Sequence, residues 1–136
     1  MNPTPQHDLD ASRWASTFPW LELAPEERET LDRLSDPELD QLAFSIARRA
    51  LENETDTPLD ELFPTLPPSF ELESLAWPSR HRNVLRRHQL ATAADLATIT
   101  IVHLLDTRAV STLITEAILA RLARAAMHHN PRSLRP

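Results

Sequence analysis

The stretch that decides the fold runs from Ser79 to Leu122 and reads SRHRNVLRRHQLATAADLATITIVHLLDTRAVSTLITEAILARL. Apolar residues recur in it at three- and four-residue spacing, and each apolar group follows a residue that can cap a helix. Four caps predict four helices: residues 78–79 before a helix over 80–88, residues 92–95 before a short second helix, Thr100 before 101–105, and Ser111 before a closing helix to about Ala126. The pattern contains no strand signal, so an all-α fold is expected.

Charge is divided unevenly along the chain. The chain has 136 residues, which is enough for one typical domain or two small ones. Its net charge is −6. Residues 1–75 hold 17 acidic residues against five arginines, a net charge of −12, whereas residues 76–136 hold nine arginines against three acidic residues, a net charge of +6. Either each half has a solvated surface of its own sign, or the basic half contacts a polyanion.

The order of motifs in the basic half resembles the C-terminal domain of the bacterial RNA polymerase α subunit. That family has an Arg-x-x-Asn-x-Leu helix, a turn with Asp-Leu, a Leu-Leu pair and a long closing helix. The matching positions here are Arg80, Asn83, Leu85, Leu90, Asp95, Leu96, Leu104 and Leu105. The resemblance implies a four-helix domain that holds two helix-hairpin-helix-like corners against DNA.

The resemblance also implies a DNA-binding site. In the family, an arginine and an asparagine of the first helix enter the minor groove of A/T-rich DNA, and the matching residues are Arg80 and Asn83. Guanidinium groups are independently expected there, because a narrow minor groove has an enhanced negative potential. Phosphate contacts would come from the neighbouring arginines, and two residues at the start of the closing helix complete the candidate set: Arg82, Arg86, Arg87, Ser111 and Thr112.

The start of the closing helix departs from the family pattern. Where the family has a glycine, a lysine, a serine and a glutamate, this chain has Ser111, Leu113, Ile114 and Ala117. About half of the family's DNA surface is therefore replaced, partly by apolar groups. A non-glycine residue held in a left-handed turn there would cost about 1–2 kcal/mol.

The rest of the chain suggests further divisions. We expect a disordered tail over 1–12, an acidic helical module over 13–54, a proline-rich linker over 55–70, the α-subunit-like module over 71–127 and a second tail over 128–136. Within the acidic module, Pro25 opens one helix, and Ser35 with Glu38 forms a capping box before an amphipathic helix to Leu51. Trp14 and Phe18 are expected to pack on these helices. Two helices bury their apolar faces poorly alone, which favours packing on the other half, on a partner, or in a homodimer through the N-terminal helices.

Several classes of function lack support in the sequence. The chain has no cysteine and no glycine, so disulfides, thiolate metal sites and glycine-rich phosphate loops are not expected, and turns must use Pro, Asn, Asp, Ser or Thr. No membrane-length apolar run or signal-peptide pattern occurs, so a cytoplasmic location is expected. The histidines show neither metal-binding spacing nor a catalytic order, so neither a metal, a cofactor nor catalysis is expected.

The sequence hypothesis is a bacterial, DNA-binding, transcription-associated accessory protein. One alternative is a protein-interaction adaptor that contacts RNA polymerase, a sigma factor or a transcription regulator without binding DNA. Another is a helix-hairpin-helix accessory subunit in DNA repair.

Overall fold

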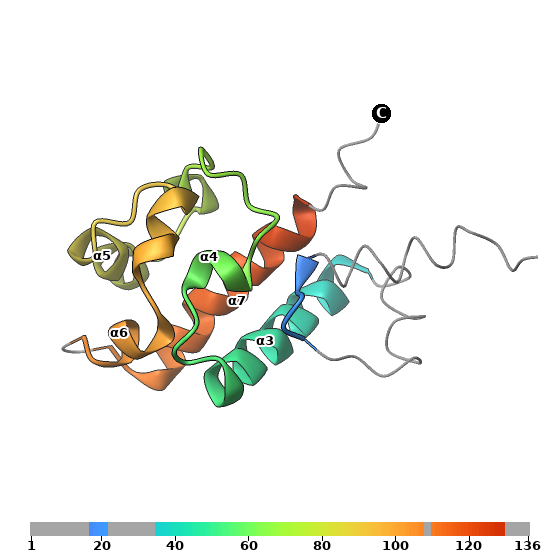
Figure 1. The fold of residues 1–136 in the computed structure, drawn as a ribbon. Coiled ribbons are helices and arrows are strands. Elements are labelled where there is room, and N and C mark those ends of the chain that lie inside the picture. The colour runs from blue at the N-terminus through green and yellow to red at the C-terminus, as the bar shows by residue number, and fades with distance from the viewer. Residues whose placement is uncertain (1–16, 22–34, 108–109, 130–136) are drawn as a thin grey trace, which may run out of the picture.

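The chain folds into packed helices joined by short connections (Figure 1). The computed structural model describes residues 17–21, 35–107 and 110–129. The elements in these residues are α3 (Asp36–Asn53), α4 (Leu59–Leu62), α5 (Ser79–Arg87), α6 (Ile101–Leu105), α7 (Thr112–His128) and the 3₁₀ turns η1 (Leu72–Leu75) and η2 (Ala93–Thr98). None of the described residues belongs to a strand, and the all-α class is confirmed. Trp14, the helix expected after Pro25 and most of both expected tails lie outside the described residues.

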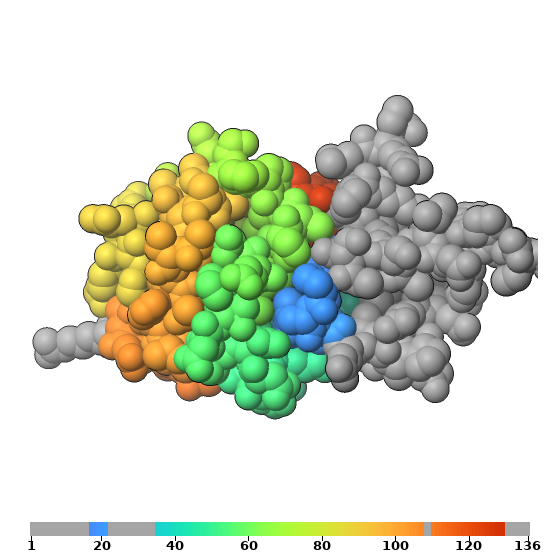
Figure 2. All heavy atoms as spheres, viewed as in Figure 1, coloured from blue at the N-terminus to red at the C-terminus, as the bar shows by residue number. Residues whose placement is uncertain are grey.

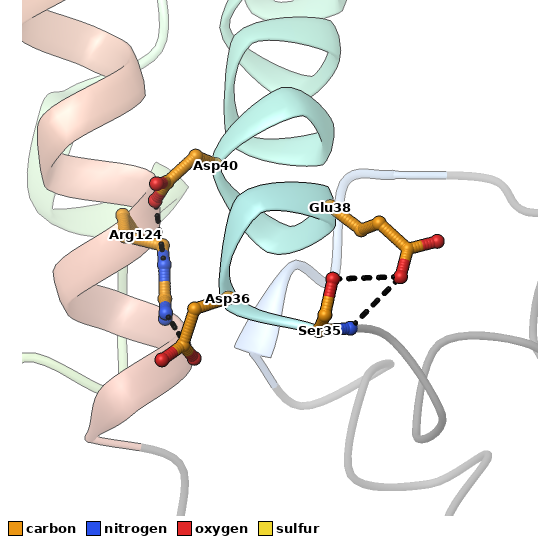
Figure 3. A network of polar contacts seen from close by, with 5 residues as sticks. All are labelled: Ser35, Asp36, Glu38, Asp40 and Arg124. Atoms are coloured by element: carbon orange, nitrogen blue, oxygen red, sulfur yellow. Dashed lines mark hydrogen bonds and ion pairs between the residues drawn. The ribbon is translucent and has the colours of Figure 1, made fainter.

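The N-terminus of α3 is fixed by the capping box that the sequence predicts. The Glu38 carboxylate accepts hydrogen bonds from the Ser35 backbone N–H, at 3.1 Å, and from the Ser35 hydroxyl, at 2.7 Å (Figure 3). These two hydrogen bonds lower the pKa of Glu38. From this start the helix turns one apolar face inward, made of Ala43, Ile46, Ala47 and Ala50.

Helix α3 packs along α7 in the antiparallel direction. Near the start of α3, the Arg124 guanidinium of α7 lies between Asp40, at 3.0 Å, and Asp36, at 3.2 Å (Figure 3). Toward the other end, Arg48 pairs with Glu116 at 3.4 Å. Exposed ion pairs of this kind contribute only about 0–1 kcal/mol each. These ion pairs fix the register of the two helices, that is, which residues of α3 lie opposite which residues of α7. Burial of the apolar faces provides most of the stabilisation.

The segment expected to be a proline-rich linker, residues 55–70, packs into the core. It contains α4, and its apolar side chains Leu59, Leu62, Phe63 and Leu66 are buried. Residues 17–21 lie against it (Figure 2). Phe18 packs edge-on against Phe63, with 6.4 Å between ring centroids, and the Trp20 indole N–H donates to the Leu62 carbonyl at 2.8 Å. The prolines keep the helix short without preventing burial of the residues between them.

A single cluster of buried side chains therefore crosses both expected module boundaries. It includes Phe18, the inner face of α3, the four residues of the 55–70 segment and most of the inner face of α7. Leu119, Leu122 and Ala126 of α7 are completely or almost completely inaccessible to solvent.

The four helices predicted for the basic half occur in the predicted order. Ser111 caps α7, with its hydroxyl accepting from the Ile114 N–H at 3.1 Å, and Thr100 caps α6. Thr92 and Asp95 form a capping box at the start of η2, which is a 3₁₀ turn. The residue before α5 is Pro78, so Ser79 is the first helical residue and not the cap that the sequence suggested. The turn η1 was not predicted.

Two non-glycine residues adopt left-handed conformations, Ala76 with φ 54° and Gln89 with φ 58°. The expectation that tight turns use only Pro, Asn, Asp, Ser or Thr is wrong at both. At Gln89 the conformation ends α5, because the Gln89 N–H donates to the Arg86 carbonyl and the Leu90 N–H donates to the Leu85 carbonyl. This is the Schellman pattern, with Leu85 and Leu90 buried beside it.

Replacing Gln89 with glycine should therefore stabilise the fold. A side chain in the left-handed region costs about 1–2 kcal/mol, which the greater freedom of glycine in the unfolded chain partly offsets. We expect Gln89→Gly to raise the free energy of unfolding by about 0.5–1 kcal/mol in urea titrations. The matched control is Gln41→Gly, at an exposed position inside α3, which should lower it by about 1 kcal/mol. Equal losses in both variants would contradict this account of the turn.

Candidate nucleic-acid interface

Helix α5 divides into an apolar face and a cationic face. Val84 and Leu85 are buried in the core. The opposite side of this nine-residue helix carries the five candidate residues that the sequence placed on it: Arg80, Arg82, Asn83, Arg86 and Arg87. Arg82 is half-buried and the other four are exposed. We call this side the α5 basic face. Helix α5 contains no acidic residue and lies at the outer edge of the molecule (Figure 1).

Arg80 and Asn83 are the most available groups on this face. They lie one helical turn apart, and Arg87 follows one turn later on the same side. Within the described part of the chain, the side chains of Arg80 and Asn83 form no hydrogen bond or ion pair with another residue. Both side chains are thus available to an external ligand without breaking an internal contact.

Arg82 and Arg86 have internal partners. Arg82 donates to the Trp77 carbonyl at 3.3 Å, which holds its stem against the loop before the helix. Arg86 lies 3.5 Å from a carboxylate oxygen of Glu73, and both of these side chains are more than 60% exposed. An exposed pair of this kind is weak, so a phosphate group can replace the Glu73 carboxylate at small cost.

The two histidines of this region lie on the side of α5 that turns toward the core. Burial, followed by the charges of Arg121 and Arg80, lowers the pKa of His81 below its usual value. Burial, followed by His103 and Arg87, lowers the pKa of His88, whose Nε2 atom is hydrogen-bonded to the Thr107 hydroxyl. Burial and nearby positive charge therefore disfavour the protonated form of both imidazoles, and arginine carries the charge of the α5 basic face.

Ser111 and Thr112 are at the start of α7 and not on α5. The Ser111 hydroxyl is used in capping, and Thr112 is exposed as the first helical residue. Ser111 has a φ of −90°, so the left-handed strain considered for this position does not arise. The hydrogen bond between His88 and Thr107 links the end of α5 to the loop that leads to α7. Leu113, also in the first turn of α7, is 77% exposed.

The remaining arginines described in the basic half have structural roles that the sequence did not reveal. Arg121 donates to the Leu75 carbonyl at 2.8 Å and lies over the Trp77 ring at 5.6 Å. Arg124 is paired with two aspartates of α3. Because these partners are 44 to 88 residues away in the sequence, no local pattern signals them. Among the described arginines of the basic half, those of α5 therefore supply the positive charge of the candidate surface.

A shallow hollow of about 540 Å³ lies beside the α5 basic face. Its lining mixes both charges with apolar groups and consists of Glu71, Glu73, Arg86 and residues 89–92.

In the ranges that the structure describes, no cluster of three His, Asp or Glu side chains is placed to hold a metal ion. No described helix combines the length and apolar character needed to cross a membrane.

Comparisons of this chain with models of known protein families, with curated proteins and with solved structures found no match.

Proposed function

We propose that this protein binds DNA through the α5 basic face, as a transcription-associated accessory protein. The observation that carries the proposal is the composition of one short helix: four arginines and an asparagine on its outer side, no acid, and an apolar inner side anchored in the core. Most protein–DNA hydrogen bonds go to phosphates, and arginine provides them in a rigid, permanently charged form.

The residues of this face divide into two roles under the proposal. Arg80 and Asn83 enter the minor groove, where guanidinium is attracted by the negative potential and an amide can donate to or accept from base edges. Arg86 and Arg87 contact the phosphate backbone, and Arg82 is oriented by its bond to the Trp77 carbonyl. Ser111 and Thr112 at the start of α7 add contacts where the helix dipole favours a phosphate.

A second candidate function, a protein-interaction adaptor, is favoured by Leu113. Among the described residues only Leu113 and Phe44 are large apolar side chains that remain exposed. A leucine that is 77% exposed, at a position where the resemblance would place lysine, suits contact with a protein better than contact with phosphate. RNA polymerase, a sigma factor or a regulator would be the partner under this function.

Fluorescence anisotropy with short A/T-rich and G/C-rich duplexes tests the proposal. We expect Arg80→Ala to weaken binding by about 1–3 kcal/mol more on the A/T-rich duplex than on the G/C-rich one. The matched control is Arg48→Ala, which removes the same charge from α3 and breaks the ion pair with Glu116, whose side chain is 15% exposed. Arg124 is a poorer control, because it pairs with two aspartates of α3, whereas Arg48 pairs with one glutamate of α7.

Two results would count against the proposal. Equal losses on both duplexes would remove the groove-entering role of Arg80 and leave only a charge effect. Absence of binding by the unmodified protein at low salt would favour the adaptor function.

A further inference from the structure

A groove with an apolar floor runs between α3 and α7, away from the α5 basic face. Its volume is about 330 Å³. The floor is formed by Ala43, Phe44, Ala117 and Ala120, while Asp40, Arg121 and Arg124 form the rim. We call this surface the α3–α7 groove. No residue of α5 lines it.

The groove combines a projecting side chain with an adjacent hollow. Phe44 of α3 is 45% exposed, although phenylalanine buries a large apolar area wherever it finds a partner. Directly beside it, α7 presents only the methyl groups of Ala117 and Ala120. A surface that carries both a large apolar group and a hollow of small residues is complementary to a copy of itself.

We propose that the α3–α7 groove is the interface of a symmetric homodimer, in which Phe44 of each copy packs on Ala117 and Ala120 of the other. A two-fold axis parallel to the two helices places α3 of one copy over α7 of its partner at the same height. Within one chain, Phe44 and the two alanines lie at the same height along the helix axes, because they line the same groove. The symmetry operation thus brings each phenylalanine onto the hollow of the other copy.

The charges on the rim agree with this arrangement. On the rim, Asp40 and Arg124 pair within one chain at 3.0 Å. Arg48 and Glu116, which do not line the groove but join the same two helices, pair at 3.4 Å. In each pair the acid and the base belong to different helices. The two-fold axis exchanges the helices, so Asp40 of one copy faces Arg124 of the other, and Arg48 faces Glu116. Opposite charges meet at each of these positions, whereas an unrelated partner would have to supply this pattern separately.

The size of the groove sets the expected strength. Helices of 17 and 18 residues are about 26 Å long, so a face formed by two of them is at the low end of stable interfaces. We therefore expect a reversible dimer with a dissociation constant on the order of micromolar. No residue of α5 lines the α3–α7 groove, and the dimer does not depend on the proposed DNA binding.

Sedimentation equilibrium of the full chain, from about 1 to about 500 μM, tests the proposal. The unmodified protein should change from monomer to dimer over this range. Phe44→Ala should weaken association about tenfold or more, because it removes the projecting group. Ala117→Phe should also weaken it, because it fills the hollow while Phe44 remains. The matched control, Gln41→Ala, changes an exposed residue of α3 outside the groove and should leave association unchanged.

The decisive variant combines Phe44→Ala with Ala117→Phe, which exchanges the projecting group and the hollow between the two helices. We expect this double variant to recover dimerisation to within about threefold of the unmodified protein. Circular dichroism confirms that each variant keeps its helix content. A monomeric unmodified protein over the whole range, an unaffected Phe44→Ala variant, or a double variant as weak as the singles would each overturn the proposal.

Discussion

A fragment of residues 71–136 is expected to lose the cooperative thermal unfolding of the full chain. Removing residues 1–70 takes away the inner face of α3 and the buried side chains Leu59, Leu62, Phe63 and Leu66. Each deleted buried leucine or phenylalanine costs about 2–5 kcal/mol, whereas an entire domain is stable by only about 5–15 kcal/mol. The summed cost of these deletions exceeds the free energy of unfolding of a typical domain. In the fragment, Leu119 and Ala126 of α7 would also face water.

Circular dichroism during heating compares this fragment with a matched fragment, residues 17–129, which keeps every described element. We expect a single sigmoidal transition for residues 17–129 and a gradual, uncooperative change for residues 71–136. Cooperative unfolding of the shorter fragment near the midpoint of the longer one would contradict the shared core, and it would support independent modules on either side of residues 55–70.

Local features of the fold were predictable because they are encoded within four or five residues. The Ser35–Glu38 capping box, the Ser111 cap and the order of helices in the basic half all follow from such short patterns. The role of residues 55–70 was not predictable in the same way. Prolines indicate where a helix must stop, but burial of Leu62 and Phe63 depends on residues 17–21 and on η2, which no local pattern brings together.

The candidate site was predictable to a similar extent. Periodicity alone places Arg80, Asn83 and Arg87 on one side of a helix, and the structure keeps them there. Periodicity does not show which arginines have internal partners. The net charge of +6 in the basic half suggested a broad cationic surface, yet Arg121 and Arg124 are held by a carbonyl and two aspartates. At least two of the arginines counted in that net charge therefore serve internal contacts.

The arginines of the α5 basic face lead to a strong prediction for the double variant Arg80→Ala, Arg87→Ala. If the α5 basic face binds DNA, loss of one groove contact and one phosphate contact should weaken binding about 100-fold at low salt. The slope of log K against log salt should become shallower by about one unit, because the lost phosphate contact of Arg87 leaves about one counterion in place. Arg86 is left unchanged, since Glu73 already competes for it.

The matched control is Arg48→Ala, Arg49→Ala, which changes the net charge of the protein by the same amount from α3. At about 0.1 M salt the screening length is only about 10 Å, so charges on a helix that does not contact DNA contribute little. We expect the control to change affinity by less than about threefold, and the slope by less than about half a unit. Anisotropy titrations of both double variants across one salt series compare their affinities and their salt slopes directly. Equal losses would mean that DNA responds to net charge alone, and α5 would then have no special role, because its arginines would be exchangeable with those of α3.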